Sequence, residues 1–474
     1  MQHTETADSR KKKRRRRKLP LPLPLPQPSS SRSAAQGQCC CCSSLVVAIT
    51  TSFSCCSQPK LMTLLLALAL LLLLCPPHLG AASSVSPRRM ARIQSHLDRI
   101  NKPAVRSIRS LDGDIIDCVA AHEQHALDHP LLKAHTIQTE PPEVPSRGGG
   151  VAAAAAYATN LKTTNGSSGG GGKINNNNKK NNPGSSRWGA WQTWHHGGHC
   201  PRGTVAIRRT TSEDVLRASS ISRFGRKKKK AVVDAARAAN APDVISGNGH
   251  EHAIAYTAPT QQQQAVYGAK ATINVWDPAI QESNGFSLSQ LWILSGSFNG
   301  SDLNSIEAGW QTSSRIAIGA SISPVSSPGG AQYDMTLLVW KDPKVGNWWL
   351  SYGDQLVGYW PAQLFTHLSD HATMVEWGGE VVDTRPAGVH TATQMGSGRF
   401  ADEGFGRASY FRNLETVDAD NSLAQVPLDA IQTLAEDAAC YDVRKAYDDG
   451  GDGHSSGWGT HFYYGGPGHN PACP

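Results

Sequence analysis

The C-terminal half of the 474-residue sequence predicts an all-β fold, an antiparallel sandwich or barrel, preceded by a small α+β segment and a disordered linker. Three observations predict it. From about Gly247, short runs rich in Val, Ile, Tyr and Trp recur between Gly, Pro, Asn and Ser. Many of these runs alternate apolar and polar residues, as half-buried strands do. Helical patterns between the runs are rare, which favours a sandwich or barrel over a parallel α/β sheet.

The first 82 residues are predicted to lie outside the folded protein. Residues 1–61 are of low complexity, because the basic run RKKKRRRRK at 10–18 precedes a Leu-Pro repeat and clustered cysteines, and such composition predicts no packed core. Residues 62–82, preceded by Lys60, have the apolar run and the small residues of a secretory signal peptide. We therefore expect Met62 to be the true start and the extension to be an error of the gene model. The alternative is a genuine basic tail ahead of a membrane anchor.

The formal net charge of +8 originates in this N-terminal extension. Residues 1–82 hold eleven Lys and Arg against two Asp and Glu, so the remaining sequence is close to neutral. We expect no nucleic-acid partner, since such a function would depend on the basic run alone. We expect a secreted monomer of the extracellular space or cell wall, without stable membrane insertion once the signal peptide is cleaved. Glycosylation sequons at Asn165 and Asn299 fit a secreted glycoprotein.

The cysteine count fits an oxidising compartment. Seven of the eleven cysteines lie in residues 1–75, which leaves Cys118, Cys200, Cys440 and Cys473. An even number in a secreted protein indicates disulfides, and four cysteines allow three connectivities. Their spacing lacks the close pairs of a zinc site. We expect neither a metal nor another cofactor.

Residues 83–246 are predicted to form the small α+β segment. Its first half has apolar residues at helical spacing, Ile93, Leu97 and Ile100. Pro103 follows and ends the predicted helix, because proline cannot continue it.

Further features subdivide this segment. SLDGDIIDCV at 110–119 predicts a turn that leads into a short strand. Residues 145–185, rich in Gly, Asn and Ser, predict a disordered linker. TSEDVLRASS at 211–220 predicts a short helix with a Thr or Ser cap. The run RKKKK at 226–230 predicts an exposed processing site ahead of a domain at 247–474, with a solvated charge run as the alternative.

The domain from residue 247 to 474 is predicted to consist of successive strands. We expect strands within residues 252–258, 271–277, 287–298, 314–323, 333–342, 347–353, 355–361, 380–385 and 461–468. Residues 419–437 alone suggest a helix in this part of the sequence.

Two carboxylates stand out by their context. Glu307 lies in NSIEAGWQ and Glu380 in VEWGGEVV, each near Gly and Trp at a predicted strand edge. Burial of either carboxylate without a partner would cost free energy of folding. Two acids brought together cannot both ionise easily, so they share a proton. One could then activate water as a general base while the other polarises a carbonyl, which is peptide hydrolysis favoured by acid. Isolated carboxylates are more often structural.

Long motifs in both halves of the chain resemble a known family. RINKPAVRSIRSLDGDIIDCV (99–119) and ALDHPLLKAHTIQ (126–138) resemble the activation peptide of the neprosin family, which consists mainly of plant proteins. The C-terminal half resembles the neprosin domain through HEHAIAY, YGAKATINVW, FSLSQLWILSGSF, DLNSIEAGWQ, SRIAIGASISP, LLVWKDPKVGNWWL, VGYWPAQLFTHL, WGGEVVDTRP, TQMGSGRFADEGFGRASYFRNL and FYYGGPGHNPAC. The resemblance covers most of residues 90–140 and 186–474.

This resemblance implies a secreted protease made as a zymogen. It implies a β-sandwich glutamic endopeptidase that is activated in acid and hydrolyses peptide bonds after proline. The motifs imply that Glu307 and Glu380 are the catalytic dyad. They also imply that residues 83–246 are an inhibitory pro-segment, that the mature enzyme starts near Gly247, and that the substrates are proline-rich proteins or peptides.

The resemblance also bears on the cysteines. Cys440 and Cys473 match the family's C-terminal disulfide. Cys118 and Cys200 both fall in the pro-segment, where they are candidates to pair with each other.

Residues near the dyad are candidates for substrate binding. Trp310, Trp377 and Tyr463 could line a groove for proline, because flat aromatic rings accept a pyrrolidine ring. Gln311 is a further candidate. Trp310 and Trp377 could equally belong to the core, where large aromatic side chains are often buried.

The sequence departs from the family pattern after Gln311. Relatives have a longer stretch there with a close cysteine pair, whereas here Gln311 runs almost directly into Arg315. A true deletion would remove the hairpin partner of the strand that bears Glu307 and expose backbone groups. We favour an error of the gene model. The alternative function is a catalytically inactive secreted β-sandwich that binds cell-wall polymers.

Overall fold

The computed structural model describes ten ranges of the chain together with the pair Lys12–Lys13. The ranges are 85–147, 189–217, 220–224, 250–257, 265–282, 285–297, 302–313, 319–382, 390–446 and 457–474. Among the described residues, Lys12–Lys13 and those from residue 91 onward belong to one compact unit and residues 85–90 to a second. The predicted signal peptide, most of the predicted linker, both sequons and the run at 226–230 lie outside the described residues.

A six-stranded sheet carries the two glutamates selected from the sequence. Its strand order is β1-β10-β9-β15-β7-β18. The strands are β1 (Lys12–Lys13), β10 (Asn304–Ser313), β9 (Phe286–Ser295), β15 (Met374–Val382), β7 (His250–Thr257) and β18 (Ile431–Ala435). All pairs are antiparallel except the two-residue pairing of β1 with β10. Apart from β1, therefore, β10 is one edge of this sheet and β18 is the other.

A nine-stranded sheet forms the second large layer. Its main path is β14-β13-β12-β8-β16-β17-β4, and β20 joins β16 and β19. The strands are β14 (Gln355–Trp360), β13 (Trp348–Tyr352), β12 (Asp334–Lys341), β8 (Gly268–Asn274), β16 (Ser409–Val417), β17 (Ser422–Gln425), β4 (Ser146–Arg147), β19 (Asp442–Ala446) and β20 (His461–Gly465).

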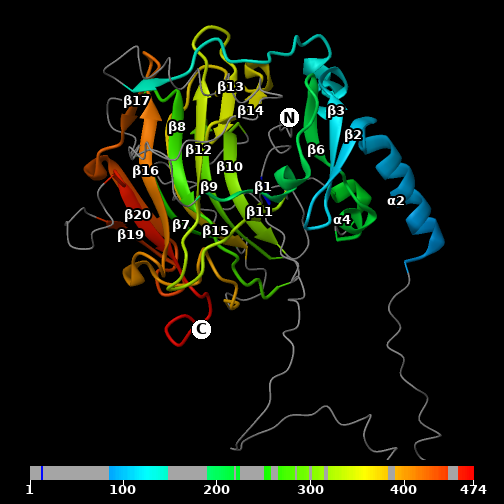
Figure 1. Ribbon diagram of the computed structural model, residues 1–474. Coiled ribbons are helices and arrows are strands. Elements are labelled where there is room, and N and C mark those ends of the chain that lie inside the picture. The colour runs from blue at the N-terminus through cyan, green and yellow to red at the C-terminus, as the bar shows by residue number, and fades with distance from the viewer. Residues whose placement is uncertain are drawn as a thin grey trace, which may run out of the picture. The chain divides into compact units, whose positions relative to one another are not determined.

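The two sheets pack face to face and enclose the main hydrophobic core (Figure 1). Leu291 of β9 and Val375 of β15 share this core with Leu337 of β12, Trp348 of β13 and Phe411 of β16. Each of these side chains is at most 1% exposed. Alternation along each strand sends every second side chain into the core. The predicted antiparallel β-sandwich is confirmed.

The N-terminal part of the described chain forms a separate small sheet with two helices. The sheet has the order β2-β3-β6, and its strands are β2 (Ala104–Arg109), β3 (Ile115–Ala120) and β6 (Thr204–Arg208). Helix α2 (Pro87–Ile100) buries Ile93 and Leu97 against Val215 of α4 (Ser212–Arg217). The helices and the strand predicted for this segment are confirmed.

Short elements complete the described structure. A two-stranded sheet pairs β5 (Trp191–Gln192) with β11 (Ile322–Ser323). The 3-10 helices are η2 (Ala121–Glu123), η3 (His125–Asp128), η4 (Pro130–Leu132), η5 (Thr193–Gly197), η6 (Ile221–Arg223), η7 (Ala362–Leu364), η9 (Ala401–Glu403) and η10 (Leu428–Ala430). The helix suggested for residues 419–437 is wrong. That segment forms β17, η10 and β18, because Ile431–Ala435 pairs with β7 instead of closing helical turns.

The N-terminal segment docks on the outer face of the nine-stranded sheet. There Trp340, Trp349 and Tyr359 form an aromatic row. The indole N–H of Trp340 donates to the carbonyl oxygen of Glu143 at 3.0 Å. The backbone N–H of Gln138 donates to the Tyr359 hydroxyl at 2.9 Å. Strand β4 then extends the sheet beside β17. The described segment is therefore fastened to the sheet that does not carry the two glutamates.

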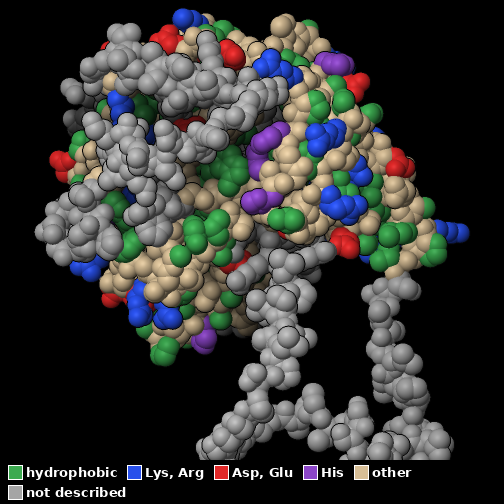
Figure 2. Space-filling model, viewed as in Figure 1, with side chains coloured by type: hydrophobic (Ala, Val, Ile, Leu, Met, Phe, Trp, Pro, Cys, Tyr) green, Lys and Arg blue, Asp and Glu red, His purple; other side chains and the backbone are tan. Residues whose placement is uncertain are grey.

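The described surface carries charges of both signs. Basic and acidic side chains are both scattered over the face that Figure 2 shows. This distribution fits the near-neutral sequence beyond residue 82. Among the helices of the described ranges, none combines the length and the apolar character that crossing a membrane requires.

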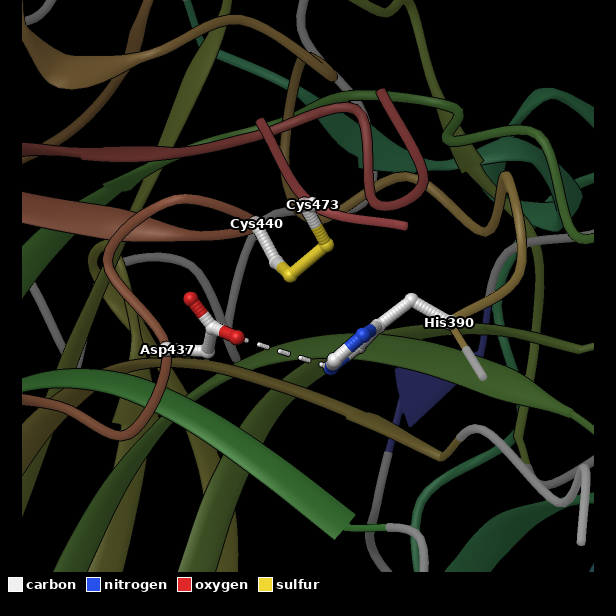
Figure 3. Close-up of side chains that lie close together, drawn as sticks. All are labelled: His390, Asp437, Cys440 and Cys473. Atoms are coloured by element: carbon white, nitrogen blue, oxygen red, sulfur yellow. Dashed lines mark ion pairs between the residues drawn. A yellow bond between two sulfur atoms is a disulfide. The ribbon is translucent and has the colours of Figure 1, made fainter. Parts of the chain in front are cut away.

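Two disulfides join the four cysteines that follow the N-terminal extension. Cys118 of β3 is bonded to Cys200, and Cys440 to Cys473, with Cα atoms 5.4 and 5.3 Å apart. Both pairings expected from the sequence are confirmed. The second bridge ties the C-terminal segment to the chain ahead of β19 (Figure 3).

Replacing Cys440 and Cys473 by Ser should lower the free energy of unfolding by about 3 kcal/mol, because the loop of 33 residues that the bridge closes regains freedom in the unfolded chain. Urea unfolding of the double variant and the wild type measures the difference. An unchanged transition midpoint would show that the bridge adds nothing to the stability of the sandwich.

Candidate active site

Glu307 lies within β10 rather than at the strand edge that the sequence suggested. It is the fourth of ten residues, all paired with β9. Its neighbours Ile306 and Ala308 face the core, so the Glu307 side chain lies on the outer face of the six-stranded sheet. The Ser305 hydroxyl donates to Glu307 Oε1 at 2.9 Å.

Glu380 lies on β15, a central strand of the same sheet. It pairs with Leu288 of β9 on one side and with His252 of β7 on the other. Its neighbour Val381 faces the core, so Glu380 shares the outer face with Glu307. The carboxylate is 13% exposed.

Glycines close to both acids allow the strands to approach. A Cβ added at Gly309 would lie 2.7 Å from Gln290 Cα, and one at Gly378 would lie 2.7 Å from Ile254 Cα. Gly378 also has φ +151°, which side chains disfavour. The glycines of EAGW and WGGE are therefore needed to set the backbone around the site.

The register fixes how the acids stand to one another. Trp292 of β9 lies opposite both Glu307 and Glu376, so Glu376 is the acid directly across β9 from Glu307. Glu380 lies four residues further along β15. In a flat sheet, the Cα atoms of Glu307 and Glu380 would differ by two strand spacings of about 4.8 Å and four steps of about 3.4 Å. The two predicted acids thus share a face without being direct neighbours in the ladder.

Two histidines flank Glu380. His250 and His252 alternate with core-facing residues on β7 and lie on the same face as Glu380. His250 Nδ1 lies 2.5 Å from Glu380 Oε1, and His252 Nε2 lies 3.9 Å from the same oxygen. The second nitrogen of His252 contacts Glu436 Oε1 at 3.3 Å, while its backbone N–H donates to Glu436 Oε2 at 2.8 Å.

This arrangement favours the ionised form of Glu380. Burial alone would raise the pKa of Glu380, but the hydrogen bond to His250 and the charge of His252 outweigh it and lower the pKa, against a smaller opposing effect of Glu307. Burial lowers the pKa of His252, whereas Glu436 and Glu380 raise it, with a net rise to about 9. Glu380 is therefore held as a carboxylate beside a protonated imidazole.

An acid on β7, Glu251, behaves in the opposite way to Glu380. Burial raises the pKa of Glu251 to about 7, with His390 lowering it and Glu436 and Asp437 raising it. Glu251 Oε1 lies 2.7 Å from His390 Nε2. The paired strands β7 and β15 thus carry one acid with a raised pKa, Glu251, and one with a lowered pKa, Glu380.

The aromatic candidates lie elsewhere. Trp310 and Trp377 are fully buried in the core between the sheets, on the side opposite to the glutamates, so the core alternative holds for both and the groove assignment is wrong. Tyr463 lies between the core residues Phe462 and Tyr464 of β20. It therefore points to the outer face of the other sheet and cannot line a groove with the glutamates.

Gln311 remains on the face that carries the glutamates. It pairs with Leu288, which in turn pairs with Glu380. Its side chain is 5% exposed.

One cluster has the residue types of a metal site. His390, Asp437, Cys440 and Cys473 lie close together (Figure 3). Both sulfur atoms are joined in a disulfide, and a disulfide offers no thiolate ligand. His390 and Asp437 remain as an ion pair at 4.0 Å. These residues do not fit a metal ion.

Sequence reasoning missed several residues of the site. The start of HEHAIAY carried a usable signal, because His250 and His252 alternate with Glu251 and so share one strand face. Glu376 and Glu436 had no such signal. Their positions depend on the pairing of β15 with β9 and on the placement of the segment after β18.

The fold defines an all-β sandwich protein with a separate N-terminal segment docked on it. The Neprosin family model matches residues 311–467, and the Neprosin activation peptide model matches residues 107–256. Together the matches span more than half of the chain, and the chain belongs to the neprosin family. A peptidase domain behind an activation peptide indicates a peptidase made as a zymogen.

The limits of the matches bear on the domain boundaries. The activation-peptide match ends at residue 256, inside β7, although β7 pairs within the sandwich. The division at 246–247 stays a prediction. Glu380 lies inside the Neprosin match, whereas Glu307 lies between the two matches.

Replacing His252 by Gln should destabilise the protein most at low pH. The pKa of His252 is raised in the folded state from 6.5 to about 9. Its contribution, on the order of 3 kcal/mol, is therefore complete below pH 6.5 and is lost as the pH rises through 9. Urea unfolding between pH 5 and pH 9.5 measures the difference between wild type and variant.

His371→Gln is the matched control, because His371 lies outside this cluster and pairs with the exposed Asp370. If the difference for His252→Gln were constant over the pH range, the protonated imidazole would not be the stabilising form.

Proposed function

We propose that this chain is the zymogen of a secreted, acid-active glutamic endopeptidase that cleaves peptide bonds after proline. The observation that carries the proposal is the placement of Glu307 and Glu380 on one sheet face, with Glu380 clamped as a carboxylate by His250. Family membership supports the peptidase class. The preference for proline rests on the sequence resemblance described above.

Each acid has a proposed role, and the lowered pKa of Glu380 supports its role as the base. The Glu380 carboxylate accepts a proton from a water molecule as general base, and the water oxygen forms a bond to the peptide carbonyl carbon. Protonated Glu307 donates its proton to the carbonyl oxygen. The tetrahedral intermediate then breaks its C–N bond when protonated Glu380 passes its proton to the leaving nitrogen. Glu307 recovers its proton from the intermediate's hydroxyl as the new carboxyl group forms.

The strand that bears Glu307 supports an active enzyme. All ten residues of β10 pair with β9, the strand that precedes it, whereas on its other side β10 pairs only with Lys12–Lys13. The shortened stretch itself, residues 314–318, lies outside the described residues. The ladder with β9 alone holds Glu307 on the outer face of the sheet, which supports the active alternative.

The N-terminal segment is proposed to act as the activation pro-segment. The contacts of Glu143 and Gln138 hold it on the nine-stranded sheet. Processing near residues 226–247 would separate this segment covalently from the sandwich. Proline-rich proteins of the cell wall or extracellular space are the proposed substrates.

Glu307→Gln and Glu380→Gln should each lower kcat by roughly 10³-fold, because each removes a proton-transfer group. The full chain is acidified, and self-processing and cleavage of a proline-containing peptide are measured. Folding is checked by circular dichroism.

Glu376→Gln is the matched control in the same strand and on the same face. Because Glu376, not Glu380, lies directly across β9 from Glu307, the comparison identifies the partner acid. Retained activity in Glu376→Gln supports the proposed pair. Loss of activity in Glu376→Gln together with full activity in Glu380→Gln would replace Glu380 by Glu376.

The pH profile should extend below the ordinary carboxyl range. Burial opposes ionisation of Glu380, but His250 and His252 lower its pKa below 4.5, so the base stays ionised in acid. His250→Gln should shift the acidic limb of kcat/KM to higher pH. An acidic limb at the same pH in wild type and variant would contradict this use of His250.

A further inference from the structure

Gln290 occupies the centre of the face that carries the glutamates. On β9 it pairs with Gly309 of β10 on one side and with Gly378 of β15 on the other. Glu307 pairs with Trp292, two residues after Gln290 on β9. Glu380 pairs with Leu288, two residues before Gln290. Gln290 therefore lies on the diagonal that joins the two acids.

The two glycines leave a strip without side chains on either side of Gln290. A Cβ at Gly309 would lie 2.9 Å from Gln290 Cγ, so a larger residue there would displace the glutamine side chain. On the opposite side, a Cβ at Gly378 would lie 3.0 Å from Ile254 Cγ2, so the Ile254 side chain packs against that position. An extended peptide laid across the strands could thus reach Gln290 without meeting a side chain from these two positions.

Gln290 is buried with an unsatisfied polar atom. The residue is 1% exposed, and within the described part of the chain its Oε1 has no hydrogen-bond partner. Leaving a buried amide group unpaired costs about 1–3 kcal/mol. An apolar side chain of the same length would avoid this cost, and Leu288 and Trp292 fill the adjacent positions of this face. The amide at this place therefore calls for a role other than packing.

We infer that Gln290 is a third catalytic group, whose side-chain amide N–H donates to the oxygen of the scissile carbonyl as negative charge develops on it. The inference rests on the proposed function. Rotation of the terminal amide exchanges its oxygen and nitrogen, so the group can present a donor to the strip. A preorganised donor in a water-poor site stabilises the transition state more than the ground state.

The position of Gln290 suits this role. The water activated by Glu380 attacks the carbonyl carbon from one side of the diagonal, and Glu307 delivers its proton to the carbonyl oxygen from the other. Gln290, between them, shares the growing charge on that oxygen before the proton arrives. The amide gives up no proton, so the balance of bonds and protons in the hydrolysis is unchanged.

The test replaces Gln290 by Met, which has a similar length and no amide. In the acid-processed full chain, kcat should fall by about 10²–10³-fold with KM within a few-fold of wild type. The melting temperature should stay equal or rise, since an unsatisfied buried amide is removed. The control is Gln432→Met, on the same sheet face, where the amide accepts a hydrogen bond from Tyr256; this variant should keep wild-type kcat.

A second readout separates charge stabilisation from packing. A phosphinic peptide of the substrate sequence mimics the tetrahedral intermediate. Its affinity should fall for Gln290→Met in proportion to kcat, whereas the affinity of an unreactive peptide of the same sequence should not change. Loss of both affinities, or of folded protein, would mean that Gln290 only shapes the sheet and would overturn the inference.

Activity of the wild type separates failure of the proposed function from failure of the role inferred for Gln290. If acid-treated wild type cleaves no peptide, the proposed function fails, and the role of Gln290 fails with it. If wild type is active and Gln290→Met retains kcat within threefold, the inference alone is overturned.

Discussion

The candidate site depends on one constraint, the register in which β9 pairs with β10 on one side and β15 on the other. This register puts Glu307, Gln290 and Glu380 on a single face and Trp310 and Trp377 in the core. A slip of one residue would exchange the two faces completely. The core therefore holds the site in place, because exposing two tryptophans would cost far more than any single polar contact gains.

Glycines at positions 309 and 378 make this register possible beside the two acids. At Gly309 and Gly378 any side chain would collide with the backbone of the neighbouring strand, so the strands can approach there only without a Cβ. At Gly309 the space that a Cβ would take is filled by the Gln290 side chain. The two glycines thus serve both strand packing and the placement of Gln290 between the acids.

Charge on the site face is organised around β7. Glu380 and Glu436 hold His252 protonated, and His252 with His250 holds Glu380 ionised. Each group is favoured in its charged form by its neighbours, although burial opposes the charge on both Glu380 and His252. Such mutual support explains how an acid in a poorly solvated place can remain a base at low pH. Glu251 lacks an equal excess of positive neighbours, and its pKa rises instead to about 7.

The sequence predicted the architecture better than the site. Period-two alternation and frequent turn residues indicated the sandwich, and four cysteines left after the N-terminal extension limited the disulfides to few choices. The acids Glu307 and Glu380 were selected from local motifs. Their separation along the sheet, and the closer position of Glu376, depend on the register between strands distant in sequence, which no local pattern specifies.

The aromatic residues illustrate the same limit. Trp310 lies three residues after Glu307, and Trp377 lies three residues before Glu380. Both separations are odd numbers. In a regular strand, an odd separation places each tryptophan on the face opposite to that of the glutamate. The local pattern does not predict a strand around Glu307, since NSIEAGWQ contains three small residues and a charge. Once β10 is known to run from Asn304 to Ser313, the core position of Trp310 follows directly.

The N-terminal segment and the two acids lie on different sheets. The N-terminal segment binds the outer aromatic face of the nine-stranded sheet, through Trp340 and Tyr359, while the acids occupy the outer face of the six-stranded sheet. Strand β7 connects these two parts of the chain, because it follows the activation segment in sequence and carries His250 and His252 beside Glu380. A cut at the proposed boundary would place a new chain end only a few residues before His250. The step that releases the segment would therefore act on the strand that sets the charge of the proposed base.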